Sequence, residues 1–484
     1  MSIETINVLL RGHDDRYALC EIISAFIPRI KLNVVSDIPA QGDYVISELT
    51  EKNGICSYKT VIYYKGQLRE HTTLGTRRHK SFVKLSFYDC ALGMMESFLP
   101  WGALTGIRPA KIARAYLSQG LSPAQARQRF IDDYRTSAEK ADLAIRVAQT
   151  ELEVLADKNP NAVSLYIGIP FCPTRCLYCS FTSQSIKFTS KFVEPYLEAL
   201  KKEIAYTAKL TRELGVSIET IYIGGGTPTS LTALQMDNLL TCLEQHFDLT
   251  QAKEFTIEAG RPDTIDMEKL RVMRGHGVDR ISINPQTMNQ KTLNLIGRSH
   301  TPQDIIDSYG MAVQAGFSSI NMDLIAGLPD ETVEHFSHTL EEVEKLDPTS
   351  VTVHTMCIKR SSFLAEQYDM YDLSGAEVVN AMLNLAAQDM AAHGRHPYYL
   401  YRQKNMLGNL ENVGYCKKGH ENRYNIYIME EVQSILALGA GASTKLVEGD
   451  LIRRVYNVKE VSEYVGRIDE MLCRKDGIIK EMNA

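Results

Sequence analysis

The segment YIGIPFCPTRCLYCSF, residues 166–181, carries three cysteines in a C-x3-C-x2-C spacing, Cys172, Cys176 and Cys179. A structural zinc site commonly has four protein ligands, often from two Cys-x2-Cys pairs, and the sequence has no second pair. Iron–sulfur clusters are held by cysteine thiolates, and with three ligands one iron of a [4Fe–4S] cluster keeps an open position for a small molecule. The spacing therefore favours such a cluster. The alternative is a zinc loop that takes a fourth ligand from elsewhere in the chain.

The cysteines directly follow the first of six short apolar runs, each separated from the next by a longer stretch of helix-forming composition. The runs are VSLYIGI (163–169), TIYIG (220–224), EFTIEA (254–259), RISIN (280–284), SINMDLI (319–325) and SVTVHT (350–355). Apolar strands that alternate with helices predict a parallel sheet covered by helices. We therefore predict an α/β fold with a partial (β/α)6 barrel. In such barrels the chemistry lies at the C-terminal ends of the strands, where the cysteines fall.

The pattern changes on either side of this barrel, and we predict three regions. Residues 1–155 mix short apolar runs with helical spacing and predict an α+β domain of unassigned role. The barrel occupies residues 160–356, after a linker rich in Asn and Pro. Residues 357–484 predict a mixed C-terminal extension on the substrate side.

Composition excludes some classes of function. The formal net charge is -6 and the pI is about 6.1, so nothing indicates the basic face of a nucleic-acid-binding protein. No run approaches the roughly 20 apolar residues of a membrane span, and the N-terminus lacks the pattern of a secretory signal. The other seven of the ten cysteines are scattered singly, which is typical of a reduced cytoplasmic protein.

Several residues at strand ends have the chemistry of a ligand site. Three glycines, Gly224–Gly226, follow the second strand and allow backbone to approach a ligand closely, although a tight turn would also use them. Glu258 ends the third strand, where a carboxylate can accept ribose hydroxyls or act as a helix N-cap. Asp323 lies within an apolar strand and needs a partner. A pair with Arg298 is one solution.

These motifs resemble those of a known family. The segments IGIPFCPTRCLYC, YIGGGTPT, FTIEAGRPD, RISINPQTM and NMDLIAGLP together resemble the oxygen-independent coproporphyrinogen III dehydrogenases, which are radical S-adenosylmethionine (SAM) enzymes. The segments TGIRPAKI, PYYLYRQKNMLGNLENVGY and LALGAGAST are similar to the HemZ-like branch of that family. The resemblance covers residues 160–445 and implies a barrel of the radical SAM type.

The resemblance also implies cofactors and their ligands. A [4Fe–4S] cluster would be held by Cys172, Cys176 and Cys179, and its open iron would bind one SAM, with a second SAM in some relatives. Residues that match the SAM-binding positions of the family are Tyr166, Tyr178, Gly225, Gly226, Thr227, Glu258, Gln286, Arg298, Asp323 and Cys357.

The family's substrate carries four propionates, so its pocket calls for cations. We expect carboxylate contacts from Lys359 and Arg360, after the sixth strand, and from Arg402 and Lys404 in PYYLYRQK. The alternative for these four residues is a solvated charged loop and a packed aromatic strand.

The activity implied by the resemblance is oxidative decarboxylation of two propionates of coproporphyrinogen III to vinyls, giving protoporphyrinogen IX. A 5′-deoxyadenosyl radical would start the reaction, and a one-electron donor such as flavodoxin or ferredoxin would reduce the cluster. No residue is required as a general base. One position differs from the characterised enzymes: Phe181 stands where they have a further cysteine. The Cys-x-Phe ending resembles the related haem chaperones, so haem binding without decarboxylation is the second hypothesis.

Overall fold

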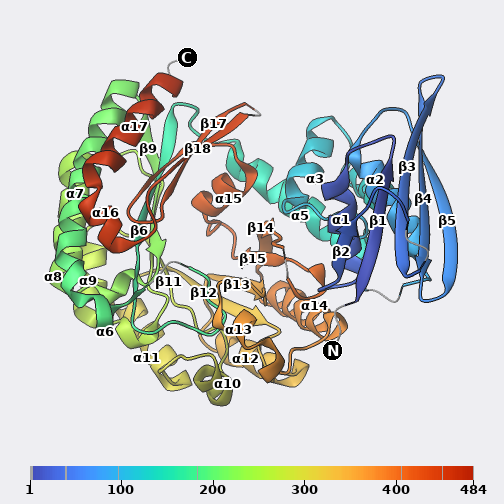
Figure 1. Cartoon of the computed structure of the whole chain (residues 1–484). Coiled ribbons are helices and arrows are strands. Elements are labelled where there is room, and N and C mark those ends of the chain that lie inside the picture. Colours follow the sequence, from blue (N-terminus) through green and yellow to red (C-terminus); the bar gives the residue numbers. More distant parts are fainter. Residues whose placement is uncertain are drawn as a thin grey trace. The chain divides into compact units, whose positions relative to one another are not determined.

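The structure is a computed structural model that describes residues 4–38, 41–95, 98–181, 184–404, 406–449 and 451–482. The chain divides into two compact units (Figure 1). Unit 1 comprises Met1–Arg146, Gly375–Glu377 and Arg402–Glu411, and unit 2 comprises the remainder. The assignment of separate roles to residues 1–155, 160–356 and 357–484 stays a prediction.

Unit 1 has the α+β composition expected for the N-terminal region. Its five-stranded sheet has the order β2-β1-β3-β4-β5. Helix α1 (Arg16–Phe26) and helix α2 (Lys80–Ala91) share a hydrophobic core with it, and α3 (Pro109–Ser118) and α4 (Pro123–Tyr134) follow. The strands are β1 (Thr5–Arg11), β2 (Lys31–Val34), β3 (Asp43–Lys52), β4 (Ile55–Tyr64) and β5 (Gln67–Gly75). Alternate residues of β4 are buried, as expected for a sheet with one covered face.

Unit 2 contains the six predicted parallel strands in a single sheet. Their spatial order follows the chain, and each pair of neighbours is parallel. They are β6 (Ala162–Ile169), β9 (Ser217–Gly225), β10 (Glu254–Glu258), β11 (Arg280–Ser282), β12 (Ser319–Ala326) and β13 (Ser350–Thr355). The described sheet has two free edges and does not close. The predicted partial barrel is therefore confirmed.

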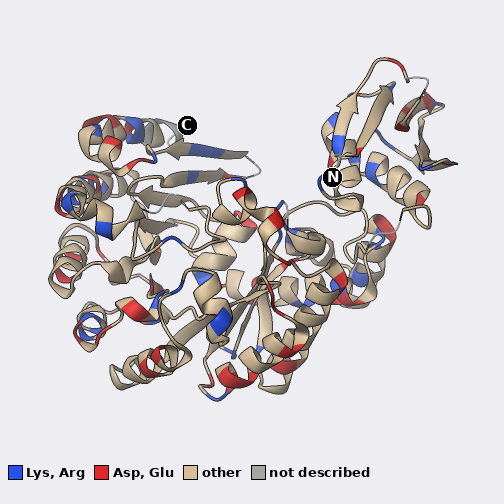
Figure 2. Ribbon diagram, turned by 60° about the horizontal axis from the view of Figure 1, so that its bottom comes forward, with Lys and Arg blue, Asp and Glu red and all other residues tan. Residues whose placement is uncertain are grey.

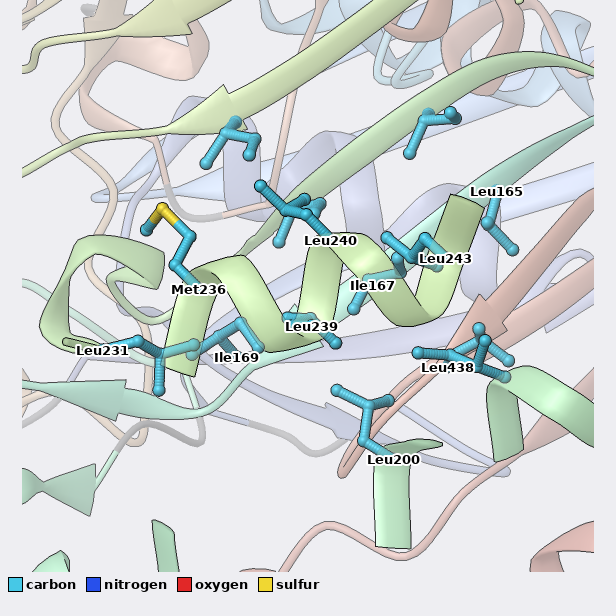
Figure 3. Packing of buried hydrophobic residues seen from close by; sticks show 14 of the residues in the cluster. Leu165, Ile167, Ile169, Leu200, Leu231, Met236, Leu239, Leu240, Leu243 and Leu438 are labelled. Atoms are coloured by element: carbon cyan, nitrogen blue, oxygen red, sulfur yellow. The ribbon is translucent and has the colours of Figure 1, made fainter. Parts of the chain in front are cut away.

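Helices connect successive strands and cover one side of the sheet (Figure 1). They are α7 (Val193–Leu214), α8 (Ala233–His246), α9 (Met267–Gly275), α11 (Pro302–Gln314) and α12 (Val333–Glu344). Met236, Leu239, Leu240 and Leu243 of α8 belong to one buried cluster with the apolar side chains of β6 (Figure 3). Seven of the eight residues of β6 are buried, because a parallel sheet packs on both faces. Figure 2 shows Lys and Arg interspersed with Asp and Glu on the helices.

Five more strands extend this sheet at both edges. On one side β16 (Ile435–Leu438) pairs in parallel with β6, followed by β17 (Ser443–Glu448) and β18 (Leu451–Tyr456). On the other side β15 (Asn412–Cys416) is antiparallel to β13, followed by β14 (His396–Tyr401). The glycine-rich turn after β16 brings backbones together: a Cβ on Gly439 would lie 2.6 Å from the Gly168 carbonyl oxygen. Within the described residues no helix is both long and apolar enough to cross a membrane.

Candidate cluster and cofactor site

The cysteine loop begins at the C-terminal end of β6. Its first cysteine lies in the short strand β7 (Phe171–Cys172), which pairs with β8 (Gln184–Ser185). Cys176 is buried, whereas Cys172 and Cys179 are partly exposed. The Leu177 amide donates a 3.0 Å hydrogen bond to the Ile296 carbonyl, and this bond ties the loop to the segment after β11. One short loop therefore carries all three thiols.

The three thiols do not all lie within 4.8 Å of one another. Around one zinc ion, with Zn–S distances of about 2.3 Å, tetrahedral sulfurs lie about 3.8 Å apart. Among the described residues two groups of ligand atoms lie within 4.8 Å of one another, and neither contains these thiols. A cube with an iron at each corner places its thiolates farther apart than one ion does. The donor set, three thiols on one loop, therefore fits a [4Fe–4S] cluster.

The glycine-rich loop after β9 packs directly on the cysteine loop. The Gly226 and Thr227 amides donate to the carbonyls of Ile169 and Phe171 at 2.8 and 2.7 Å. The Thr227 hydroxyl donates to the Cys172 sulfur at 3.4 Å. Gly225 has a φ of +104°, which favours glycine. This loop thus supports the first cluster ligand.

We expect Gly226→Ala to destabilise unit 2 by roughly 2–4 kcal/mol, because a Cβ there would lie 2.6 Å from the Phe171 carbonyl oxygen. Chemical denaturation followed by circular dichroism would measure the change. The matched control is Gly310→Ala in helix α11, where a Cβ meets nothing within 4 Å. That variant should be neutral or up to about 1 kcal/mol more stable. Equal stabilities of the two variants would contradict the expectation.

Arg261 is a site residue that the sequence reasoning missed. Its side chain is buried, with 3% of its surface exposed. The guanidinium donates to the Cys176 sulfur at 3.8 Å and to the Thr174 hydroxyl at 3.0 Å. Two further bonds of 2.9 Å to the Asp263 carboxylate fix its orientation. The available signals were its position two residues after a predicted strand and its place in the segment FTIEAGRPD.

We expect Arg261→Gln to lower the reduction potential of the bound cluster by on the order of 50 mV. Positive charge and hydrogen bonds at the cluster sulfurs favour the reduced state, so their removal disfavours it. Potentiometric titration followed by electron paramagnetic resonance would measure the shift. Arg271→Gln, an exposed change on α9, is the control and should leave the potential unchanged. An unaltered potential in Arg261→Gln would show that the guanidinium does not act on the cluster.

A cavity of about 420 Å³ lies beside the two loops. Tyr166, Gly225, Gly226 and Glu258, all predicted SAM contacts, line it together with Phe181. The remaining walls come from helix α15 (Arg423–Glu430), from β16 and from the turn that leads into β17. The cavity therefore contacts segments far apart in sequence.

Three tyrosine rings form a flat wall of this cavity. Tyr222 stacks on Tyr424, with ring centroids 4.6 Å apart and planes 21° apart. Tyr166 lies nearly parallel to both, at 6.3 Å from each. Flat aromatic surfaces favour stacking with flat ligands. Neither was predicted as a contact: Tyr222 begins the segment YIGGGTPT, of which only the glycines and Thr227 were assigned, and Tyr424 lies in none of the quoted segments.

The carboxylate of Glu258, the last residue of β10, is hydrogen-bonded to one tyrosine of this wall. The Tyr222 hydroxyl donates a 2.5 Å hydrogen bond to its carboxylate. Burial raises the pKa of Glu258 to about 7, and the bond from Tyr222 only partly opposes this rise. The structure thus places an acceptor inside the cavity, with a pKa close to neutral pH.

Asp323 and Arg298 do not form the pair considered from the sequence. Asp323 accepts a 2.7 Å hydrogen bond from Asn321 and lies 3.6 Å from the His354 ring nitrogen. Burial would raise the pKa of Asp323, but its bonds to these partners and the charge of His354 hold that pKa below the usual value. Arg298 instead donates to the Gly260 carbonyl at 3.2 Å and to the Tyr178 hydroxyl at 3.3 Å.

Gln286 connects these residues to the sheet. The backbone amide of Gln286 donates to the backbone carbonyl of Asp323 at 2.9 Å, and the backbone carbonyl of Gln286 accepts from the backbone amide of Ile325 at 3.0 Å. Its φ of +69° is uncommon for a residue other than glycine, and such backbone positions cluster at ligand sites. Cys357 is partly exposed and lies just after β13.

The predicted substrate contacts fall into two groups. Lys359 and Arg360 follow β13 in unit 2, and the Lys359 ammonium lies 5.8 Å from the Phe181 ring centroid. Arg402 and Lys404 belong to unit 1. The buried Arg402 guanidinium donates to the carbonyls of Gly106 and Asn409 at 3.3 and 2.7 Å. The Lys404 ammonium lies 4.4 Å from the Tyr17 ring centroid.

These contacts give Arg402 a packing role within unit 1. Its guanidinium also lies 5.3 Å from the Trp101 ring centroid, and its amide donates to the Ile107 carbonyl at 2.8 Å. Within unit 1, Arg402 of the segment PYYLYRQK therefore packs against Gly106 and Ile107 of the segment TGIRPAKI.

Comparison with known proteins agrees with this geometry. The model of the Radical SAM superfamily matches residues 166–343. The solved structure of coproporphyrinogen III oxidase HemN from Escherichia coli, described as a radical SAM enzyme, matches with a TM-score of 0.53 and 26% identity over 67% of this chain and 73% of that chain. The fold and the site thus define a radical SAM protein, with a [4Fe–4S] cluster and SAM as its cofactors.

Two bacterial relatives indicate the branch of the radical SAM superfamily to which the chain belongs. The chain is 40% identical to the oxygen-independent coproporphyrinogen-III oxidase-like protein HemZ of Bacillus subtilis, over 96% of this chain and 95% of that protein. It is 32% identical to the haem chaperone HemW of the same organism, over 63% of this chain and 76% of that protein. The chain belongs to the HemZ-like branch of the haem-related radical SAM family.

Proposed function

We propose that the protein converts two propionates of coproporphyrinogen III to vinyls without oxygen and gives protoporphyrinogen IX. The observation that carries the proposal is the position of Lys359, whose ammonium lies 5.8 Å from the ring of Phe181 on the cysteine loop. A cation at that place suits a propionate held next to the cluster. The 40% identity to HemZ along nearly the whole chain supports it.

The residues take separate parts in this reaction. Cys172, Cys176 and Cys179 hold the cluster, which together with SAM supplies a 5′-deoxyadenosyl radical when both are bound. Glu258 accepts the ribose hydroxyls of SAM, and the tyrosine wall lines the cavity beside it. The other SAM contacts are Tyr178, Gly225, Gly226, Thr227, Gln286, Arg298, Asp323 and Cys357.

Lys359 and Arg360 bind propionate carboxylates. Each propionate loses one hydrogen atom from its β-carbon, one molecule of carbon dioxide and one electron, which passes to a one-electron acceptor. A flavodoxin or ferredoxin supplies the electron that reduces the cluster. The reaction takes place in the cytoplasm, and one or two molecules of SAM bind.

A haem-binding chaperone is the second candidate, and Phe181 favours it. This side chain is 60% exposed and lines the cavity, and it stands where the characterised enzymes have a further cysteine. The 32% identity to a protein named as a haem chaperone agrees with this alternative. An exposed aromatic ring beside a cavity suits a flat tetrapyrrole.

An anaerobic assay separates the two candidates. The reconstituted, reduced protein would receive SAM with coproporphyrinogen III, and 5′-deoxyadenosine, carbon dioxide and vinyl products would be measured together. We expect all three products, at a ratio of one carbon dioxide per 5′-deoxyadenosine. Stoichiometric haem binding with no carbon dioxide would overturn the decarboxylase and favour the chaperone. 5′-Deoxyadenosine without a vinyl product would indicate a different substrate.

A further inference from the structure

A second group of metal-ligand side chains lies at the opposite end of the unit 2 sheet. His396, the first residue of β14, is the cross-strand partner of Cys416, the last residue of β15. Cys416 also pairs with Ser350, the first residue of β13. The group therefore lies where β13 begins, whereas the cysteine loop follows the C-terminal end of a parallel strand.

Glu421 completes the group after a tight turn. Its carboxylate oxygen lies 3.1 Å from His396 Nε2, and Cys416 Sγ lies 3.9 Å from the same nitrogen. All three ligand atoms lie within 4.8 Å of one another. The Gly419 amide donates to both carboxylate oxygens, at 3.2 and 3.1 Å, and so orients the carboxylate toward the other two.

The separations and the donor types match those of a zinc site. Zinc binds thiolate, imidazole and carboxylate at about 2.0–2.3 Å, so tetrahedral ligand atoms lie about 3.3–3.8 Å apart. The distances of 3.1 and 3.9 Å differ little from these values. One thiolate and one carboxylate would balance the charge of Zn²⁺. The Cys416 side chain is buried, while the His396 side chain is 32% exposed, which leaves access for a fourth ligand.

The surrounding charges are compatible with this ion. Without a cation, burial and the neighbouring Glu421 carboxylate raise the pKa of the Cys416 thiol, and the positive charge of Arg280 partly opposes them. A divalent cation at the group would instead stabilise the thiolate. The Arg280 guanidinium donates to the His420 carbonyl and the Ser319 hydroxyl, at 2.8 and 3.2 Å.

In a comparable group elsewhere in unit 2, one of the three side chains is already bound by a guanidinium. Glu344, Asp389 and His393 also bring their ligand atoms within 4.8 Å of one another. Both Glu344 carboxylate oxygens, however, accept 2.8 Å hydrogen bonds from the Arg395 guanidinium. A guanidinium there occupies the place that a cation would take.

We propose that His396, Cys416 and Glu421 bind one Zn²⁺, with a water molecule as the fourth ligand. The site is separate from the cluster and does not depend on the proposed reaction. It would fix the turn before Asn422, whose side chain caps the N-terminus of α15 by accepting from the Asn425 amide at 2.7 Å. Helix α15 carries Tyr424 into the tyrosine wall. Zinc would therefore order one wall of the cofactor cavity.

Competition with a chromophoric chelator tests the proposal. The full-length protein with Cys172, Cys176 and Cys179 all changed to Ala removes the thiols that would otherwise bind added zinc. We expect this protein to retain one equivalent of Zn²⁺, and to show a thiolate-to-metal absorption band when Co²⁺ replaces it. Cys416→Ser in the same background should weaken zinc binding at least about 100-fold and abolish the band, because second-shell changes alone cost about 10–100-fold.

Cys242→Ser is the matched control. Its sulfur lies 3.7 Å from the His246 ring nitrogen, but within the described residues no third ligand joins that pair. This variant should retain the zinc. If Cys416→Ser fails to fold, as judged by circular dichroism, His396→Gln replaces it, since that side chain is partly exposed. Failure of the background protein to bind one equivalent, or full retention in either ligand variant, would overturn the proposal.

Discussion

Cys176→Ala should abolish cluster binding and, with it, the reductive cleavage of SAM. A bound [4Fe–4S] cluster needs its thiolates, and two remaining ligands on a partly exposed loop cannot replace the third. Loss of a ligand should cost more than the roughly 10–100-fold in affinity that a second-shell change costs. Iron and sulfide analysis with visible absorption would measure the cluster, and 5′-deoxyadenosine formation would measure cleavage.

The surroundings of Cys176 make this variant interpretable. Arg261, which contacts the sulfur, keeps both bonds to Asp263 when the sulfur is removed, so no buried charge loses its main partner. We therefore expect the variant to fold. Cys473→Ala, at an exposed thiol, is the control and should retain full cluster content. Retention of four irons by Cys176→Ala would contradict the assignment of this residue as a ligand.

The affinity for SAM should rise about tenfold between pH 6 and pH 8, through ionisation of Glu258. Burial raises the pKa of this carboxyl to about 7, and only the ionised form accepts both ribose hydroxyls. With a pKa near 7, roughly a tenth of the groups are ionised at pH 6 and roughly nine tenths at pH 8. The pKa of Asp323 lies below its usual value, so Asp323 stays ionised throughout this range.

Isothermal titration calorimetry of the reconstituted protein at several pH values would measure the effect. Glu258→Gln should bind SAM about 10–100-fold more weakly at pH 8 and lose the pH dependence, because a neutral amide cannot ionise. Glu268→Gln, an exposed change on α9, should retain both the affinity and the pH dependence. A pH dependence that persists in Glu258→Gln would assign the titration to another group.

The same ionisation acts on stability with a definite sign. The folded pKa of Glu258 lies above its usual value, so the folded state binds more protons than the unfolded state between about pH 4.5 and pH 7. The contribution of Glu258 to stability is therefore lost as the pH rises through this window. Binding of SAM at the ionised carboxylate would offset that loss.

Local sequence patterns were enough to predict the parallel sheet and the cluster ligands. The six strands of the barrel are short apolar runs between helical stretches. They are apolar along their length because a covered parallel sheet buries both faces of each strand. The cysteine spacing is equally local, since one loop carries all three thiols. Both features depend on residues close together in the chain.

Other features depend on pairings between distant segments. Strand β16 lies parallel to β6, Tyr424 stacks on Tyr222, and Asp323 lies beside His354 while Arg298 bonds elsewhere. Arg402 packs against Trp101 in unit 1. Residue spacing predicts which face of an element is buried, but it does not specify which of several polar or aromatic groups will meet that face. Those partners were decided by tertiary packing, because the free energy of each contact is realised only when the distant segments come together.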